Sequence, residues 1–160
     1  MKDFISEFIF GSKAETLYRL KEKLSSSEIP SFFHFSLEEW TANKETILKR
    51  ISEMKSHEQD SVIIRSSASN EDGELFANAG AFLSIPHIDP NNKELVQSSI
   101  RKVFNSYKDN KNKITPNRKD QIMVQTMIKD ISMSGVIFTH AMNTGAPYYV
   151  INYDDETGKT

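Results

Sequence analysis

At residues 62–67 the chain reads V-I-I-R-S-S, and the prediction of the fold starts from this stretch. Its first three residues form a compact run of β-branched side chains between polar segments, which predicts a buried strand. Arg65-Ser66-Ser67 then places a guanidinium and two hydroxyls at the strand end, where ligand groups often lie in mixed α/β folds. These donors suit an oxyanion, and an ion pair between Arg65 and a nearby acid such as Glu71 or Asp72 is the alternative interpretation.

Two capping boxes predict helices upstream of this strand. Residues 12–15 (S-K-A-E) and 36–39 (S-L-E-E) each place a serine three residues before a glutamate, so that the two side chains can bond to helix-end amides reciprocally. We expect one helix from residue 12, and a second from residue 36 to about 54 with a break near Asn43. The three phenylalanines within residues 32–35 predict a buried strand between these helices.

Downstream of residue 67 the pattern predicts a turn at Asp72-Gly73 and a helix over 91–107. Three more strands follow, at residues 122–128, 135–139 and 148–153. Their connections are too short for crossover helices, so we expect these three strands to form an antiparallel meander. Helices packed on a mixed or antiparallel sheet define an α+β fold.

The composition excludes several classes of protein. A chain of 160 residues is one ordinary domain or one lobe of a larger one. Its net charge of -2 gives no general attraction to nucleic acid or anionic lipid. Apolar runs are too short to span a membrane and the start has no signal-peptide layout, so we expect a cytoplasmic protein without a membrane partner. Cysteine is absent and the four histidines lack metal-ligand spacing.

Two further residues have both a functional and an ordinary interpretation. Lys13 lies in the first turn of a predicted helix, where unpaired amides can donate to a phosphate, but a solvated lysine on an exposed face fits as well. Gly80, between two alanines, would let a ligand approach the backbone closely, but it also fits a simple turn. The individual signals do not decide between these interpretations.

Five segments taken in order resemble the nucleotide-binding region of phosphoenolpyruvate synthase and pyruvate phosphate dikinase, an ATP-grasp family. Residues 11–17 (G-S-K-A-E-T-L) look like its G-x-K-x-x-x-L segment, and residues 63–72 (I-I-R-S-S-A-S-N-E-D) look like V-R-S-S-A-x-x-E-D. Residues 79–84 (A-G-A-F-L-S) are similar to the glycine loop that covers the nucleotide phosphates. Residues 124–128 (V-Q-T-M-I) and 134–139 (S-G-V-I-F-T) resemble V-Q-x-M-V and S-G-V-x-F-T. The resemblance spans nearly the whole chain.

The resemblance implies a set of ATP ligands. Lys13 and Arg65 would hold the phosphates, and Gly80 and Ser84 would belong to the covering loop. The implied reaction is phosphoryl transfer, in which positioning and charge neutralisation do most of the work and Mg²⁺ bridges phosphate oxygens. Arg65 would be the catalytic residue, because it would stabilise the charge that develops on the transferred group.

The resemblance also implies how the chain is divided. Gln125, Met127 and Ile128 would form the hinge beside adenine. We expect residues 1–120 to form a first ATP-grasp subdomain, and residues 121–160 to supply the hinge strand and the start of a second, truncated lobe. The metal ligands and the other domains of the enzyme would then lie beyond this chain, which alone should not turn over. An uncovered lobe surface would favour self-association.

The acceptor and the activity leave alternatives open. Residues 148–158 (Y-Y-V-I-N-Y-D-D-E-T-G) look more like divergent bacterial relatives linked to surface-polysaccharide genes, some of which are glutamine kinases on the route to capsule phosphoramidate. Pyruvate and the glutamine amide are the two acceptors we weigh. Leu83, where several relatives carry an acid, and His140-Ala141-Met142 after F-T depart from the family pattern. A non-catalytic nucleotide-binding or regulatory module is the alternative function.

Overall fold

A computed structural model describes residues 11–54, 60–67, 72–73, 76–77, 83–107 and 119–156. The chain forms two compact units, Met1–Met127 and Ile128–Thr160. Within the described ranges, no helix combines the length and the apolar character needed to cross a membrane. The subdomain boundary expected after residue 120 stays a prediction about family organisation.

The first unit is organised by a four-stranded antiparallel sheet in the order β1-β6-β2-β5. The strands are β1 (Phe32–Ser36), β6 (Gln121–Thr126), β2 (Val62–Ser67) and β5 (Ser84–Ile88). Strand β2 confirms the strand predicted at V-I-I-R-S-S. Strand β6 lies between β1 and β2 and is buried along four consecutive residues, as expected of a strand covered on both faces.

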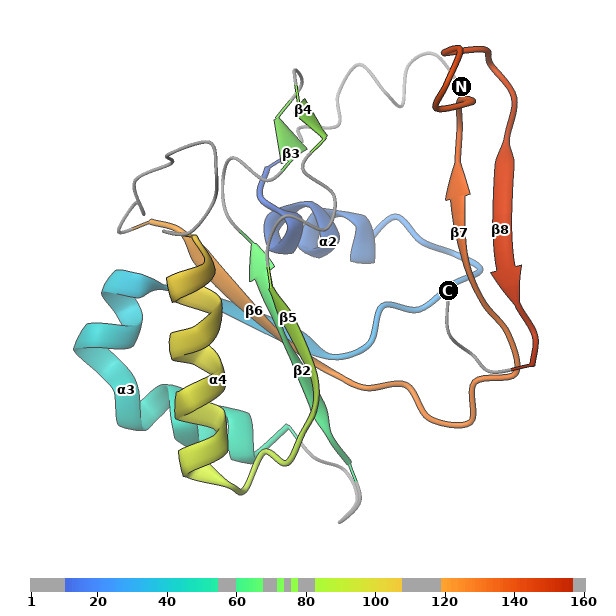
Figure 1. Cartoon of the computed structure of the whole chain (residues 1–160). Helices are drawn as coiled ribbons and strands as arrows, with labels where there is room; N and C mark the ends of the chain where they lie inside the picture. Colours follow the sequence, from blue (N-terminus) through green and yellow to red (C-terminus); the bar gives the residue numbers. More distant parts are fainter. Residues whose placement is uncertain are drawn as a thin grey trace. The chain divides into compact units, whose positions relative to one another are not determined.

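Helices α3 (Leu37–Ser52) and α4 (Lys93–Ser106) pack on one face of this sheet (Figure 1). The predicted capping box of Ser36 and Glu39 is present, and the expected break occurs at Asn43, with φ -131° and ψ 35°. The side chains of both helices join the inward side chains of the strands in one apolar core. Its buried members are Phe33, Phe35, Ile47, Leu48, Ile51, Val62, Ile64, Ile88, Val96, Ile100, Val103, Phe104, Tyr107, Ile122 and Val124.

Helix α2 (Lys13–Lys21) belongs to the opposite face of the sheet, which we call the α2 face (Figure 1). Its predicted capping box is present, because Ser12 Oγ accepts from the Glu15 amide and the Glu15 carboxylate accepts from the Ser12 amide. Among the residues of α2, Ala14 is the buried one. This helix therefore contributes little to the apolar core.

A small hairpin corrects one prediction. Strands β3 (Asp72–Gly73) and β4 (Phe76–Ala77) pair antiparallel, with Asp72 opposite Ala77 and Gly73 opposite Phe76. The Asp-Gly pair was predicted to be a turn. That prediction is wrong, because an Asp-Gly pair signals a turn only where it occupies the central turn positions, and here both residues are paired within a strand.

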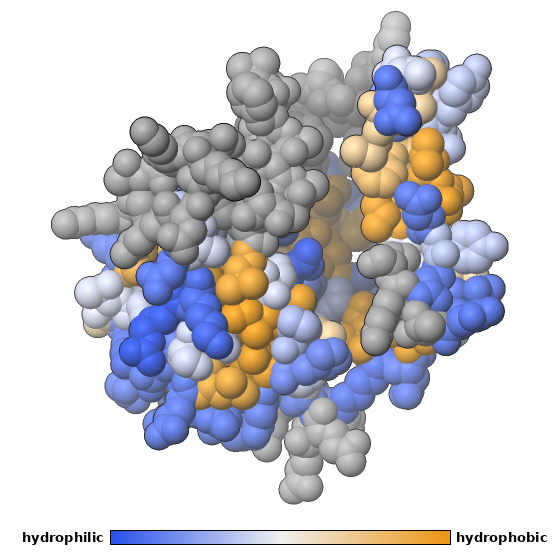
Figure 2. Space-filling view, in the orientation of Figure 1, coloured by the Kyte–Doolittle hydropathy of each residue, from blue (hydrophilic) through white to orange (hydrophobic). Residues whose placement is uncertain are grey.

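The second unit contains the hairpin of β7 (Ser134–Phe138) and β8 (Val150–Asp154). The predicted meander of three strands is wrong, because β6 pairs with β1 along one edge and β2 along the other. Both hydrogen-bonding edges of β6 are therefore occupied, and β7 cannot pair with this strand. Both faces of the hairpin expose apolar side chains, Val136 on one and Ile137, Ile151 and Tyr153 on the other, and Figure 2 shows apolar surface on it. Helices on antiparallel strands confirm the α+β class.

Candidate functional site on the α2 face

Arg65 lies in a row of side chains that crosses the whole sheet. The registers pair His34 with Met123, Met123 with Arg65, and Arg65 with Ser84, so one residue from each strand belongs to the row. Directly paired residues of antiparallel strands project from the same face. Since their neighbours in sequence point into the apolar core, this row belongs to the α2 face. The strand register therefore brings together two of the predicted phosphate ligands, Arg65 and Ser84.

The guanidinium of Arg65 has unused hydrogen-bonding capacity. Its Nε is buried, and within the described part of the chain it has no hydrogen-bond partner. A buried donor without an acceptor is unfavourable, and such a donor in a native fold calls for an explanation. An oxyanion on the α2 face would accept from Nε. Of the two acids in the alternative ion pair, Glu71 lies outside the described ranges and Asp72 is described in its backbone alone.

A second row ties helix α2 to the sheet. Ser67 pairs with Gln121 at the end of the β2–β6 ladder. The Ala14 amide donates to Ser67 Oγ at 2.9 Å, and Ser12 Oγ donates to Gln121 Oε1 at 2.7 Å. Both residues that flank Lys13 are therefore bonded to adjacent strands, and α2 begins on the same face as Arg65.

The bonds of the first turn of α2 limit what this helix can offer a phosphate. In a first helical turn, unpaired amides can donate to an anion. Here the amides of Ala14 and Glu15 donate to Ser67 Oγ and Ser12 Oγ, the second of these as the predicted capping box requires, and the Glu15 carboxylate already occupies the helix N-terminus. Any contribution of Lys13 to anion binding thus comes from its ammonium group rather than from these two amides. Ser67 likewise serves as an acceptor for the helix.

Glu15 keeps its charge in this arrangement. The hydrogen bond from the Ser12 amide, followed by that from the Gln121 side chain, lowers the pKa of Glu15, while burial raises it. Arg19 and His34 lower the pKa further through their charges. The net pKa of Glu15 is below its usual range, so the carboxylate is ionised at neutral pH.

Tyr107 closes the same end of the ladder from the core face. Its hydroxyl donates to the Gln121 carbonyl oxygen at 2.7 Å and accepts from the Ser67 amide at 3.1 Å. Tyr107 is 1% exposed, and its ring packs edge-on against Phe104 with centroids 6.0 Å apart. The backbone positions of the two residues that anchor α2 are therefore held by a group from the C-terminal end of α4.

The predicted adenine hinge lies at the end of β6. Gln125 is buried and belongs to the α2 face, where it pairs with Phe32 on one side and Ile63 on the other. Met127 continues the pairing beyond β6, because its amide donates to the Ser61 carbonyl oxygen at 2.9 Å. Ile128 is exposed and begins the second unit. The contact of these residues with adenine stays a prediction.

Only the end of the predicted covering loop is described. Gly80 lies outside the described residues, so its predicted role stays a prediction. Ser84 is exposed and starts the edge strand β5, and Leu83 is 40% exposed. The Ser66 amide donates to the Leu83 carbonyl oxygen at 3.3 Å, which holds the last part of the loop beside β2.

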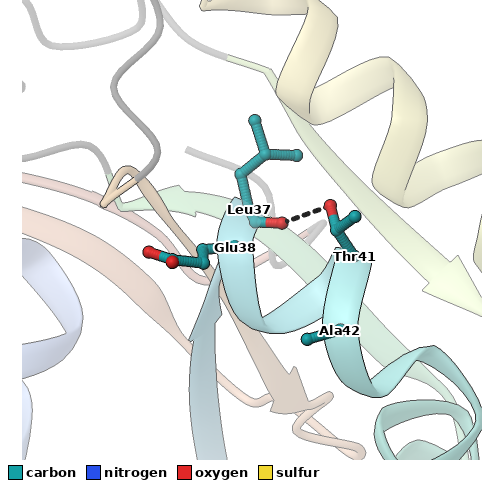
Figure 3. A pocket seen from close by; sticks show the side chains of 4 residues that line it. All are labelled: Leu37, Glu38, Thr41 and Ala42. Atoms are coloured by element: carbon teal, nitrogen blue, oxygen red, sulfur yellow. Dashed lines mark hydrogen bonds between the residues drawn. The ribbon is translucent and has the colours of Figure 1, made fainter.

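A separate cavity of about 400 Å³ opens at the start of α3 (Figure 3). The described residues that line it are Leu37, Glu38, Thr41 and Ala42, and the Thr41 hydroxyl donates to the Leu37 carbonyl oxygen at 2.8 Å. Its lining is mainly apolar and, in the described part, holds a carboxylate but no cation. This cavity therefore suits a triphosphate less well than the α2 face does.

The metal ligands of the nucleotide site were predicted to lie beyond this chain. Within the described ranges, no group of three or more histidine or carboxylate side chains lies close enough together to hold a metal ion. Mg²⁺ is usually held by one or two carboxylates besides phosphate and water oxygens. The placement of these ligands stays a prediction, and no chemical step is assigned to the metal.

The comparison with protein families agrees with these observations. Residues 14–154 match the family model described as pyruvate phosphate dikinase, AMP/ATP-binding domain. The chain belongs to this family. No curated protein and no solved structure gives a significant match. The pyruvate phosphate dikinase AMP/ATP-binding domain indicates nucleotide binding and supports the ATP-grasp interpretation of the α+β fold. Arg65 and Ser84 lie inside the matched range, whereas Lys13 immediately precedes it.

Sequence reasoning about this family member missed the anchor of helix α2. Gln121 was not singled out, because it forms its two side-chain bonds with residues more than a hundred positions away in the chain. The local capping box did predict that Ser12 and Glu15 bond to each other. No local pattern at Gln121 indicates that it joins them.

Proposed function

We propose that the α2 face binds the triphosphate of ATP, with Arg65 and Lys13 as the cationic ligands and Ser84 beside them. The observation that carries this proposal is the buried Nε of Arg65, which has no hydrogen-bond partner among the described residues and lies in a row that ends at Ser84. The guanidinium of arginine is planar and can donate two parallel hydrogen bonds to phosphate oxygens. A bound nucleotide can therefore supply the acceptor that the Arg65 Nε lacks among the described residues. The family match supports a nucleotide as the anion.

We also propose that the bound nucleotide is a phosphoryl donor. Phosphoryl transfer breaks a P–O bond of ATP and forms a new bond to the acceptor, while negative charge is spread over the phosphoryl oxygens. A fixed guanidinium next to these oxygens stabilises that charge without reorganising during the reaction. Pyruvate and the side-chain amide of glutamine are the proposed acceptors, and phosphorus NMR of ATP incubated with each of them and the full-length gene product distinguishes the two.

Calorimetric titration with ATP tests the binding site. Arg65→Ala should weaken ATP binding at least about ten-fold, since it removes charge-assisted hydrogen bonds to phosphate. Arg65→Lys should recover only part of the loss, because it keeps the charge but not the fork. The matched control is Arg101→Ala, an exposed arginine of α4 on the other layer of the unit. Equal ATP affinity for wild type and Arg65→Ala would contradict the proposal.

A further inference from the structure

We propose that Gln121 is a positioning residue, which fixes the ammonium of Lys13 relative to the guanidinium of Arg65. The inference rests on the proposed role of these two cations in nucleotide binding. It assigns no contact between Gln121 and the nucleotide. Gln121 acts instead through the first turn of α2, because it bonds to Ser12 and Glu15, which lie on either side of Lys13 in the chain.

The side chain of Gln121 closes a ring of hydrogen bonds with the capping box. Gln121 Oε1 accepts from Ser12 Oγ at 2.7 Å, and Gln121 Nε2 donates to Glu15 Oε1 at 3.1 Å. Glu15 Oε2 accepts from the Ser12 amide at 3.0 Å, and the Glu15 amide donates to Ser12 Oγ at 3.3 Å. Each of the three residues both donates and accepts, so the ring has one consistent arrangement of protons.

The register of the sheet fixes the spacing between this ring of hydrogen bonds and Arg65. Gln121 is paired with Ser67, and Ser67 Oγ accepts from the Ala14 amide, so the residues on either side of Lys13 are bonded to β6 and β2, Ser12 through its hydroxyl and Ala14 through its backbone amide. Arg65 precedes Ser67 on the same face of β2, at a distance along the strand of about 7 Å. The position of Lys13 relative to Arg65 is therefore set by two anchors on neighbouring strands.

Apolar packing cannot replace these anchors. Ala14 is the buried residue of α2, and no residue of this helix belongs to the apolar core. The described polar bonds at the N-terminus therefore hold α2 in register with the sheet. Gly11 supports the arrangement, because a Cβ at this position would collide with the Glu15 carboxylate.

The ring requires an amide at position 121. A glutamate there could still accept from Ser12 Oγ, but it would place a second carboxylate against Glu15 instead of a donor. Exchanging the two side chains restores the pattern: in Glu15→Gln/Gln121→Glu, the new amide donates to the new carboxylate and still accepts from the Ser12 amide. The double variant also has the same total charge as the wild type.

Titration calorimetry with ATP on the full 160-residue chain tests the inference. Gln121→Glu should weaken ATP binding about ten-fold, and the exchanged double variant should bind within about two-fold of wild type. Gln97→Glu on α4 is the matched control for the added charge, and it should leave affinity unchanged. Thermal melting of each variant shows that the measured protein is folded.

A cycle with Lys13→Ala separates positioning from general stabilisation. If Gln121 acts through Lys13, Gln121→Glu has no further effect on ATP affinity once Lys13 is alanine. A merely structural role would weaken binding by the same factor in both backgrounds, and that result overturns the inference. So does a double exchange that binds as weakly as Gln121→Glu. If Arg65→Ala weakens binding but Gln121→Glu does not, the inference alone is overturned; if the wild type does not bind ATP, the proposed function fails with it.

Discussion

Strand β6 faces two different environments. On one face Ile122 and Val124 are buried in the apolar core with α3 and α4. On the other face Met123 is also buried, but its neighbours include the buried polar side chain of Gln125 and the Arg65 Nε, for which the described part of the chain offers no hydrogen-bond partner. The core face is held by packing of many apolar groups, whereas the α2 face is held by hydrogen bonds to particular residues. Stability therefore depends mainly on one side of the sheet, and the proposed ligand binding depends on the other.

The largest expected loss of stability comes from the core face. Ile64→Ala removes a fully buried side chain of β2 and should lower the free energy of unfolding by about 3 to 4 kcal/mol, measured by urea denaturation. The conservative variant Ile64→Val should lose about 1 kcal/mol. A loss below about 1 kcal/mol for the alanine variant would contradict the assignment of this face as the core.

A smaller loss should follow from Tyr107→Phe. The Tyr107 ring belongs to the apolar core, and its hydroxyl bonds to the backbone of two residues whose side chains lie on the α2 face. The change leaves the Ser67 amide and the Gln121 carbonyl oxygen without the hydroxyl that joins them, at a cost of about 2 kcal/mol in urea denaturation. Tyr18→Phe is the matched control, because Tyr18 is exposed on α2 and should change stability by less than about 0.5 kcal/mol. Equal effects of the two changes would show that the bridging hydroxyl does not hold the ladder end.

The smallest effect concerns the charge of Glu15. Because the folded state lowers the pKa of Glu15, its contribution is complete above the unfolded pKa and is lost as the pH falls through the folded pKa. Solvent screens this partly exposed carboxylate, so Glu15→Gln should cost about 0.5 kcal/mol at neutral pH. Urea denaturation of both proteins across pH should show the difference shrinking in the acidic range. A difference that grows as the pH falls would contradict the sign.

Local signals in the sequence predicted much of this arrangement. The capping boxes that start at Ser12 and Ser36 and the break at Asn43 were predicted correctly, because each depends on residues within one or two helical turns. The strand containing Arg65 was also predicted, since its apolar run is compact.

These local signals could not predict which strands pair or which residue anchors α2. The pairing of β6 with β1 and β2 joins segments far apart in the chain, so short connections wrongly favoured pairing with β7. Gln121 and Glu15 are 106 positions apart, and a sequence pattern does not show that they meet. Nor does a local pattern show that the Ala14 amide donates to Ser67 Oγ, because Ser67 comes from a distant strand.

The central claim is that Arg65 donates to a nucleotide phosphate on the α2 face. Its most direct test is ¹H–¹⁵N NMR of the Arg65 Nε–H group, assigned through its loss in Arg65→Lys, during titration with ATP. The predicted result is a progressive downfield proton shift that saturates with the binding curve, because the buried Nε–H gains a phosphate acceptor. An Arg65 Nε–H signal that stays unchanged while ATP binds and shifts other resonances would contradict the account.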